Sequence, residues 1–370
     1  AYMSVKKAYL RKNREMPAGK YKKNGFVCWR HVFTGLNVKT GDKKTFFIEC
    51  FIVNPSRLSE QPVFGQLYEQ KIKKYYPSYI MVKAGTWGKK SVQIHRFYPV
   101  SDMHCERRYF DIHLPDFQMG EETLSGSVFM SENDVLVHPE YMSDAGSMSW
   151  NLTVRKNLAY TFKNINWHTQ GIKAEYGGKL VFCGEDYIVT PEQSYGYADK
   201  FWGCDFVSPL IYIASSHIIS EISRLPLKNT CFAVGCGGSK TLGPHAEPLY
   251  SAVFYYEGER YDFPLSGLWK KSRIKLDFKE GEENLHWLVS AETKKYLFDI
   301  DVFCPQNETL FINYEAPSGN KYHNRLWSCG NGSGEIKLFH KGGKKLELIE
   351  HARLENSFCE YGEYDMLDFI

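Results

Sequence analysis

The segment with the clearest potential for chemistry is Tyr195–Pro209, which reads YGYADKFWGCDFVSP. Acidic, phenolic and indole side chains are concentrated in it, as Tyr195, Tyr197, Asp199, Trp202 and Asp205. An acid that protonates an alkene or an ether must itself be neutral, and an apolar site raises the pKa of a carboxyl group because it disfavours the charged form. We therefore take Asp199 as the candidate proton donor, with Tyr197 beside it.

Aromatic faces in the same segment suit the cation that such a protonation creates. The ring quadrupole of Tyr or Trp attracts a cation by ~0.5–2 kcal/mol per ring, which Tyr197 and Trp202 could supply. The alternative is structural: Asp199 and Lys200 form a surface turn while Trp202 fills the core. If Asp199 is instead a buried, unpaired acid, its pKa is raised, and Asp199→Asn should leave stability unchanged or increase it near neutral pH.

A second set of residues could bind a substrate beside this acid. It comprises Trp29, His31, Glu49, His168 and Tyr195, together with Trp202, and Trp29 and Trp202 are expected to face one cavity. A lone His or Glu in a strand is more often a satisfied structural residue, so both interpretations stay open. No H-x-H, H-E-x-x-H or paired cysteine spacing occurs, so we expect no metal and no other cofactor.

Two other motifs do not carry a function. Gly235–Lys240, GCGGSK, does not match the phosphate-loop pattern and is expected to be a turn at the end of a strand. Cys28 and Cys204 flank aromatic motifs, but nothing marks either thiol as an activated nucleophile.

The composition is that of a folded globular protein. Hydrophobic residues make up 43% and charged residues 24% of 370 residues, a length that suggests two domains at roughly 150 residues per domain. The net charge of +3 arises from 46 basic and 43 acidic residues that are interspersed, which argues against nucleic acid as a partner. No apolar run approaches the roughly 18 residues of a membrane helix. Ten cysteines without a C-x-x-C pair indicate reduced, mostly buried thiols, so we expect a cytoplasmic protein.

Alternation of apolar and polar residues with period two predicts a mainly β protein, with at least ~40% strand. Turn signals separate the strands, as at Lys39–Asp42, Tyr176–Lys179, Tyr256–Glu259 and Lys341–Lys344. The predicted strands are Thr45–Val53, Tyr79–Lys83, Val92–Tyr98, Lys179–Phe182, Tyr187–Val189, Tyr250–Tyr256, Ile274–Phe278, Leu285–Ser290, Tyr296–Phe303 and Ile336–Phe339. Short helices are expected at Gln66–Tyr75 and His217–Arg224. Thr190–Ser194 lacks strand character and suggests two domains, residues 1–193 and 194–370.

Several short motifs occur in a recognisable order along most of the chain. GFVCWRH at Gly25–His31, VKAGTWG at Val82–Gly88, MSWNL at Met148–Leu152, YADKFWG at Tyr197–Gly203 and NSFCEYGEY at Asn356–Tyr364 follow one another. In this order they resemble the tocopherol cyclase-like superfamily, which includes the carotenoid 1,2-hydratases and AttH-like bacterial proteins.

The resemblance implies two lipocalin-like antiparallel β-barrel domains with a ligand cleft near their junction. It also implies that Tyr197 and Asp199 matter for adding a proton to a prenyl double bond. Phe201 stands where this family usually has Asn, which removes a polar neighbour from the motif.

Three functions compete on this basis. The first is a cofactor-independent hydratase, cyclase or isomerase that acts on a hydrophobic, prenyl-like or polycyclic small molecule. The second is a lipocalin-like carrier in which the same rings enclose an apolar ligand. The third is a carbohydrate-binding protein with stacking Trp and Tyr. An Asp199 that is buried and unpaired favours the enzyme, an exposed Asp199 favours the carrier, and a flat open Trp platform favours the sugar binder.

Overall fold

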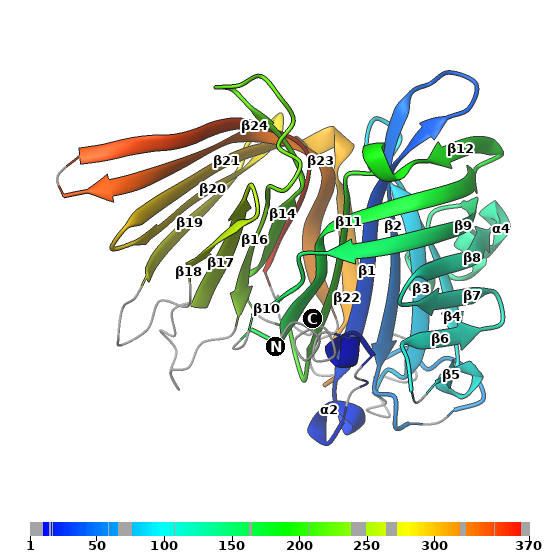
Figure 1. Cartoon of the computed structure of the whole chain (residues 1–370). Coiled ribbons are helices and arrows are strands. Elements are labelled where there is room, and N and C mark those ends of the chain that lie inside the picture. The colour runs from blue at the N-terminus through cyan, green and yellow to red at the C-terminus, as the bar shows by residue number, and fades with distance from the viewer. Residues whose placement is uncertain are drawn as a thin grey trace.

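The computed structural model describes residues 10–363 except 15, 17, 58, 66–75, 107, 163–164, 207, 238–248, 264–271, 319–322 and 344. Among these residues, strands account for 66% and helices for 9%, which confirms the predicted mainly β class. The strands form two large antiparallel sheets that lie side by side (Figure 1).

The first sheet contains 13 strands in the described part of the chain, in the order β4-β3-β2-β1-β12-β11-β9-β8-β7-β6-β5 with β10 and β13 off this path. Strands β12 and β13 each pair with both β1 and β11, so these four strands close into a small barrel. The strands are β1 (Phe26–Asn37), β2 (Lys43–Val53), β3 (Tyr79–Thr86), β4 (Val92–Tyr98), β5 (His104–Cys105), β6 (Asp111–Leu114), β7 (Phe117–Gly120), β8 (Thr123–Met130), β9 (Gly146–Asn157), β10 (Tyr160–Phe162), β11 (Trp167–Phe182), β12 (Glu185–Val189) and β13 (Gly196–Gly203).

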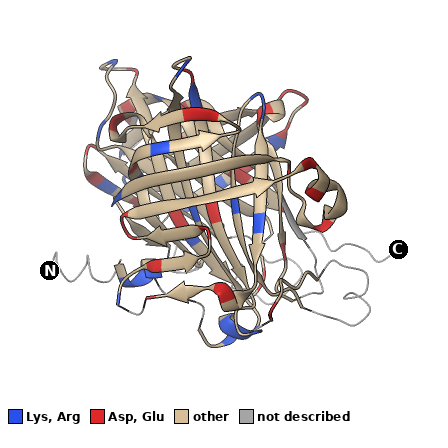
Figure 2. Cartoon of the chain, turned by 90° about the vertical axis from the view of Figure 1, so that its right-hand side faces the viewer, with Lys and Arg blue, Asp and Glu red and all other residues tan. Residues whose placement is uncertain are grey.

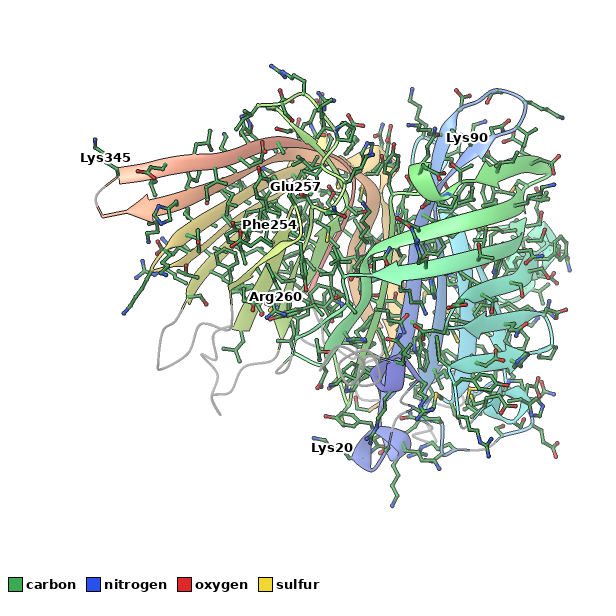
Figure 3. The ribbon with its side chains drawn as sticks, viewed as in Figure 1. Lys20, Lys90, Phe254, Glu257, Arg260 and Lys345 are labelled. Carbon is green, nitrogen blue, oxygen red and sulfur yellow. The ribbon has the colours of Figure 1, made fainter. Side chains whose placement is uncertain are left out.

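The second sheet contains 11 described strands, in the order β18-β17-β16-β14-β24-β23-β21-β20-β19 with β15 and β22 at the side. The strands are β14 (Leu210–Ser215), β15 (His217–Ser220), β16 (Cys231–Gly237), β17 (Leu249–Tyr256), β18 (Glu259–Phe263), β19 (Ser272–Glu280), β20 (Asn284–Thr293), β21 (Tyr296–Pro305), β22 (Leu310–Glu315), β23 (His323–Gly342) and β24 (Lys345–Glu363). Lys345 lies near the tip of the long β23–β24 hairpin, far from the first sheet (Figure 3).

Helices are few and short in the described residues. They are α2 (Lys20–Lys23), α4 (Glu132–Val137), a helical turn at residues 10–14, and the 3-10 turns η1 (Val100–Asp102), η2 (Pro139–Tyr141), η3 (Pro191–Gln193) and η4 (Gln306–Glu308). No helix among these residues is long and apolar enough to cross a membrane. Figure 2 views the outer strands of the first sheet, where Lys and Arg are interspersed with Asp and Glu.

Three apolar cores result from this arrangement, and the site depends on their order. The first core lies inside the first sheet, and the third lies inside the second sheet, where Phe254 stacks on Phe298 at 4.4 Å (Figure 3). The middle core joins the sheets, because it contains residues from β1 and β13 as well as from β14, β22 and β24. Strand β1 is therefore buried on both faces: Val27 and Trp29 enter the first core, and Cys28 and Val32 enter the middle core.

The predicted strands all lie within observed strands, and Val92–Tyr98 has the observed bounds of β4. Two local predictions are wrong. His217–Arg224 begins as strand β15 because His217–Ser220 pairs with β24, and the predicted turn Tyr176–Lys179 is an internal part of β11, whose glycines face Thr153 and Leu152 of β9. The helix predicted at Gln66–Tyr75 and the end of the Gly235–Lys240 motif lie outside the described residues.

The ten cysteines are free thiols, and seven of them are buried. The proposed domain boundary at residues 193 and 194 stays a prediction. Along the chain, the change from the first sheet to the second occurs between Gly203 and Leu210, because β13 pairs with β1 and β11.

Candidate active site

A row of alternating charges crosses four neighbouring strands on the face of the first sheet that meets the second. Asp199 of β13 stands directly opposite Arg30 of β1, Arg30 opposite Glu49 of β2, and Glu49 opposite Lys83 of β3. None of these four residues is more than 1% exposed. Directly opposite positions on antiparallel strands bring side chains of one face together, so strand register alone places each charge beside its opposite.

The Arg30 guanidinium and the Asp199 carboxylate form a two-point contact. Nε of Arg30 donates to Oδ1 at 3.2 Å and Nη2 donates to Oδ2 at 2.7 Å. Oδ2 of Asp199 also accepts hydrogen bonds from Trp167 Nε1 at 2.8 Å and from the Tyr197 hydroxyl at 2.7 Å. Asp199 therefore accepts hydrogen bonds from four donors, two of which belong to a cation.

Glu360 of β24 reaches the same guanidinium from the second sheet. Nη1 of Arg30 donates to Oε2 of Glu360 at 2.5 Å, while Oε1 of Glu360 is buried without a hydrogen-bond partner among the described residues. Aromatic rings surround the cation: the guanidinium carbon lies 4.2 Å from the ring centre of Phe358, 5.2 Å from Phe201 and 5.6 Å from Tyr212. Glu360 thus presents one free carboxyl oxygen in an apolar, aromatic environment.

The other end of the charged row forms a second buried ion pair. Nζ of Lys83 lies 2.7 Å from Oε2 of Glu49, and the hydroxyl of Tyr314, from β22 of the second sheet, donates to the same oxygen at 2.7 Å. Lys83 Nζ also donates to the Tyr314 hydroxyl at 3.2 Å. The second sheet therefore contributes a polar side chain at two places along the row, Glu360 at Arg30 and Tyr314 at Glu49 and Lys83.

The charges of this cluster balance only when one carboxyl group carries a proton. Two cations, Arg30 and Lys83, face three carboxyl groups, Asp199, Glu360 and Glu49. A net buried charge is costly, so one carboxyl group should be neutral. Glu360 has the fewest donors, and burial raises its pKa from 4.5 to about 7 against the opposing effect of Arg30, with Glu49 adding to the rise.

Arg30 stays charged in this arrangement. Burial by itself would lower the pKa of Arg30, but the carboxyl groups of Asp199 and Glu360 outweigh it and raise that pKa well above its ordinary value. The contact with Arg30 lowers the pKa of Glu360, but burial has the larger, opposite effect, so the pKa of Glu360 still rises. We assign the shared proton to Glu360, as one member of a coupled group.

The residues proposed from the sequence divide between the two faces of β1 and β13. Tyr197, Asp199 and Glu49 belong to the charged row, on the face toward the second sheet. Trp29, His31, Trp202 and His168 belong to the opposite face, inside the first sheet. Alternation along a strand causes this separation, since residues one position apart point to opposite faces.

Trp29 and Trp202 do share surroundings, but not those of Asp199. The Lys200 ammonium lies 5.3 Å from the Trp29 ring centre and 5.4 Å from that of Trp202. His168 lies nearby, because its Nε2 and the Trp29 indole both contact Asn13, at 2.9 Å each. Tyr195 lies apart from both groups, with its ring stacked on His217 at 3.5 Å.

The residues that complete the charged row were not among the candidates predicted from the sequence. Arg30, Lys83, Glu360, Trp167, Tyr212 and Tyr314 are all buried there. A signal existed for two of them, because a charge in the middle of an apolar strand, such as Lys83 in YIMVKAG or Arg30 in FVCWRHV, must find a buried partner. No such signal indicated Glu360, although it lies in a segment that carried the family resemblance.

The acid hypothesis for Asp199 meets two of its conditions. Asp199 is fully buried, and the Tyr197 hydroxyl is bonded to it. It is not unpaired, however, since Arg30 binds both of its oxygens. A buried carboxyl with one oxygen that lacks a partner among the described residues is instead found at Glu360, whose other oxygen accepts from Arg30.

Comparison with solved structures supports the fold. An AttH-like protein from Nitrosomonas europaea is similar over 91% of this chain and 92% of its own, with 10% sequence identity and a TM-score of 0.50. CghA, solved with Sch210972, matches at 10% identity and TM-score 0.49 over 92% and 89% of the two chains. Kievitone hydratase from Nectria haematococca matches at 9% identity and TM-score 0.44 over 96% and 98%. No family model and no curated protein sequence matches this chain. The mainly β fold expected from the sequence is thus confirmed, with two large sheets and one small closed barrel, and it resembles the fold of the AttH-like protein.

Proposed function

We propose that this protein catalyses an acid-initiated hydration, cyclisation or isomerisation of a hydrophobic small molecule between its two sheets, without a cofactor. One observation carries the proposal. The Glu360 carboxyl group is buried, has one oxygen without a partner, and has a pKa of about 7. A general acid is most effective when its pKa lies near the working pH.

The reaction begins when Glu360 transfers its proton to a carbon of an alkene, and the electron pair of the double bond forms the new C–H bond. The adjacent carbon becomes a cation. In a hydration, a water oxygen adds to that carbon and then returns a proton to the Glu360 carboxylate, so that the net change is the addition of one water. In an isomerisation, a neighbouring C–H gives up the proton instead.

Arg30, Asp199 and Tyr197 act as positioning residues in this scheme. Once Glu360 has lost its proton, the 2.5 Å contact with Arg30 stabilises the new carboxylate. Asp199 fixes the plane of the guanidinium through its two contacts, and Tyr197 and Trp167 fix Asp199. The role that the sequence suggested for Asp199 thereby passes to Glu360, while Asp199 remains part of the same site.

The surroundings of Glu360 suit a substrate of prenyl or polycyclic type. Phe201, Tyr212 and Phe358 face this region, and Tyr197 stacks on Phe358 at 5.5 Å. Ring faces stabilise a carbocation, and apolar walls exclude water from it until the chosen acceptor reacts.

A carrier of an apolar ligand is the second candidate, and the Arg30–Glu360 contact between β1 and β24 favours it. A buried ion pair of this kind can hold the two sheets in register without any chemistry. A carbohydrate-binding protein has less support, because none of the described tryptophans is exposed.

The test compares Glu360→Gln with Glu350→Gln, a buried glutamate on the same strand that is bonded to Ser220 and Tyr256. Each variant is incubated in D2O with squalene, lycopene and geranylgeraniol, and products that gain D2O or a single deuterium are detected by mass spectrometry. Turnover by the native protein and by Glu350→Gln, but not by Glu360→Gln, supports the enzyme. If all three proteins bind an alkene without converting it, the carrier is correct.

A further inference from the structure

The inside of the first sheet contains polar groups that the proposed active site does not use. His31 of β1 points there, on the opposite face from Arg30, and is 1% exposed. Lys156, near the end of β9, has a side chain that is only 3% exposed. Both groups lie in a core built from large apolar residues such as Trp29, Phe33 and Trp150.

The hydrogen bonds of His31 determine which ring nitrogen carries the proton. Tyr176 donates its only hydroxyl hydrogen to the backbone oxygen of Tyr197 at 3.0 Å, so its oxygen must accept from His31 Nδ1, 2.9 Å away. Nδ1 therefore carries the hydrogen and Nε2 has a free lone pair. Nε2 is buried and has no partner among the described residues. Burial, aided by Lys156, lowers the pKa of His31 and keeps the ring neutral.

The Lys156 amine has fewer partners than its three hydrogens require. Its nearest acceptor is the backbone oxygen of Gly120 at 3.4 Å, and the Phe110 ring centre is 5.0 Å away. Its ion pair with Glu121 is long, at 3.9 Å, and both oxygens of Glu121 already accept from Asn13 at 2.7 and 2.9 Å. Burial lowers the pKa of Lys156 to about 8, against the effect of Glu121. The amine is thus a buried donor group that lacks a close anion.

Strand register places His31 and Lys156 in the same part of this core. Lys156 stands opposite Ala174 of β11, and Tyr176 follows two residues later on the same face of that strand. Tyr176 in turn holds His31. Two further buried polar atoms of the same core, the Tyr98 hydroxyl and Trp150 Nε1, also have no hydrogen-bond partner in the described part of the chain. Unpartnered buried polar atoms in such numbers indicate a ligand or water that completes them.

We propose that the inside of the first sheet binds an apolar monocarboxylic acid, with its carboxyl group between Lys156 and His31 and its hydrocarbon part against the surrounding rings. The proton count balances. The acid donates its O–H to the lone pair of His31 Nε2, and its other oxygen accepts from the Lys156 amine. An ester has no hydrogen to donate to His31 Nε2, so it can satisfy only the Lys156 amine. This site is separate from the one at Glu360, because β1 and β13 lie between them.

The test uses the fluorescent cis-parinaric acid and its methyl ester, which has the same hydrocarbon part but neither a proton to donate nor a charge. Titration of the full-length protein should give at least a tenfold tighter dissociation constant for the acid than for the ester. In Lys156→Met, the acid and the ester should both bind at least tenfold more weakly than to the native protein, because each loses the hydrogen bond from the amine, whereas His31→Phe should weaken only the acid. Lys179→Met, which removes an exposed amine from β11 of the same sheet, should keep the preference for the acid.

Three results would overturn the proposal: equal binding of acid and ester by the native protein, native affinity for the acid in Lys156→Met, or no binding of either probe. Lys156→Arg is the control for a folding defect in Lys156→Met, since it keeps a cation at this position. If Lys156→Met unfolds, the preference for the acid must persist in Lys156→Arg and be reduced at least tenfold in His31→Phe. A preference that survives in His31→Phe would contradict the assigned carboxyl position.

Discussion

Arg30 Nη1 and Glu360 Oε2 lie 2.5 Å apart although 330 residues separate them in the chain. The contact joins β1 of the first sheet to β24 of the second, in the middle of the core between them. A single guanidinium thus contacts one carboxylate from each sheet, so that any relative movement of the sheets would break a buried charge contact. Both the stability and the proposed chemistry depend on it.

Replacing Arg30 by Met should destabilise the protein by about 3–5 kcal/mol, because Asp199 and Glu360 would then be buried without their cation. Urea unfolding at pH 7 measures the loss. The double variant Arg30→Met, Asp199→Asn should recover part of it, since it removes one stranded carboxylate. A loss below about 1 kcal/mol in the single variant would show that the ion pairs are not formed.

Asp199→Asn should also destabilise the protein, by roughly 2–4 kcal/mol at pH 7. The sequence alone predicts no loss, on the assumption of an unpaired acid. The structure reverses that expectation, because the substitution takes the two-point carboxylate contact from Arg30 and puts an amide next to the donors of Trp167 and Tyr197. Thermal and urea unfolding of the variant distinguish the two expectations. Unchanged stability would favour Asp199 as the unpaired acid that the sequence suggested.

Glu360 makes stability depend on pH. Its pKa rises from 4.5 to about 7 on folding, so the unfolded chain releases this proton first and the native state loses stability as pH increases from 4.5 to 7. A shift of this size corresponds to about 3 kcal/mol. Glu360→Gln has no such proton, so its stability relative to the native protein should increase by that order between pH 4.5 and 8. Urea unfolding at both pH values tests this, and a constant difference would contradict it.

Lys156 should have the opposite pH dependence. Its pKa falls from 10.5 to about 8 on folding, so the cost of burying the ammonium is complete below pH 8 and disappears as pH rises to 10.5. Lys156→Met should therefore be more stable than the native protein at pH 7, by up to about 3 kcal/mol, and this advantage should shrink by pH 10. Thermal melts across that range measure it, and an advantage that grows with pH would rule the explanation out.

Gly235 allows the second sheet to approach the first. A Cβ at this position of β16 would lie 2.4 Å from the ring of Trp167, whose indole binds Asp199. Gly235→Ala should cost about 1–3 kcal/mol and disturb the charged row. Near-ultraviolet circular dichroism should register the displaced Trp167. A variant with native stability and an unchanged spectrum would mean that the two sheets can separate slightly without penalty.

The sequence by itself determined the strand content and most strand positions. Alternation in segments such as Val92–Tyr98 and turn glycines such as Gly258 are local signals, and they need no knowledge of distant residues. The order of short motifs added the family resemblance, and with it the expectation of two lipocalin-like barrels. The same reasoning failed at Tyr176–Lys179, where a Gly-Gly pair that looks like a turn lies inside a long strand because β9 pairs along it.

Only the tertiary structure decided which candidate residues meet. Strand β1 is apolar on both faces. Its sequence pattern therefore could not show which core Trp29 and His31 enter, or that Arg30 points into the other core. Nor could it show that Glu360 from the last described strand reaches Arg30 with one carboxyl oxygen and leaves the other without a partner among the described residues. Strand register and the packing of one sheet on the other decide such contacts, because charge balance in a buried cluster depends on every group brought into it.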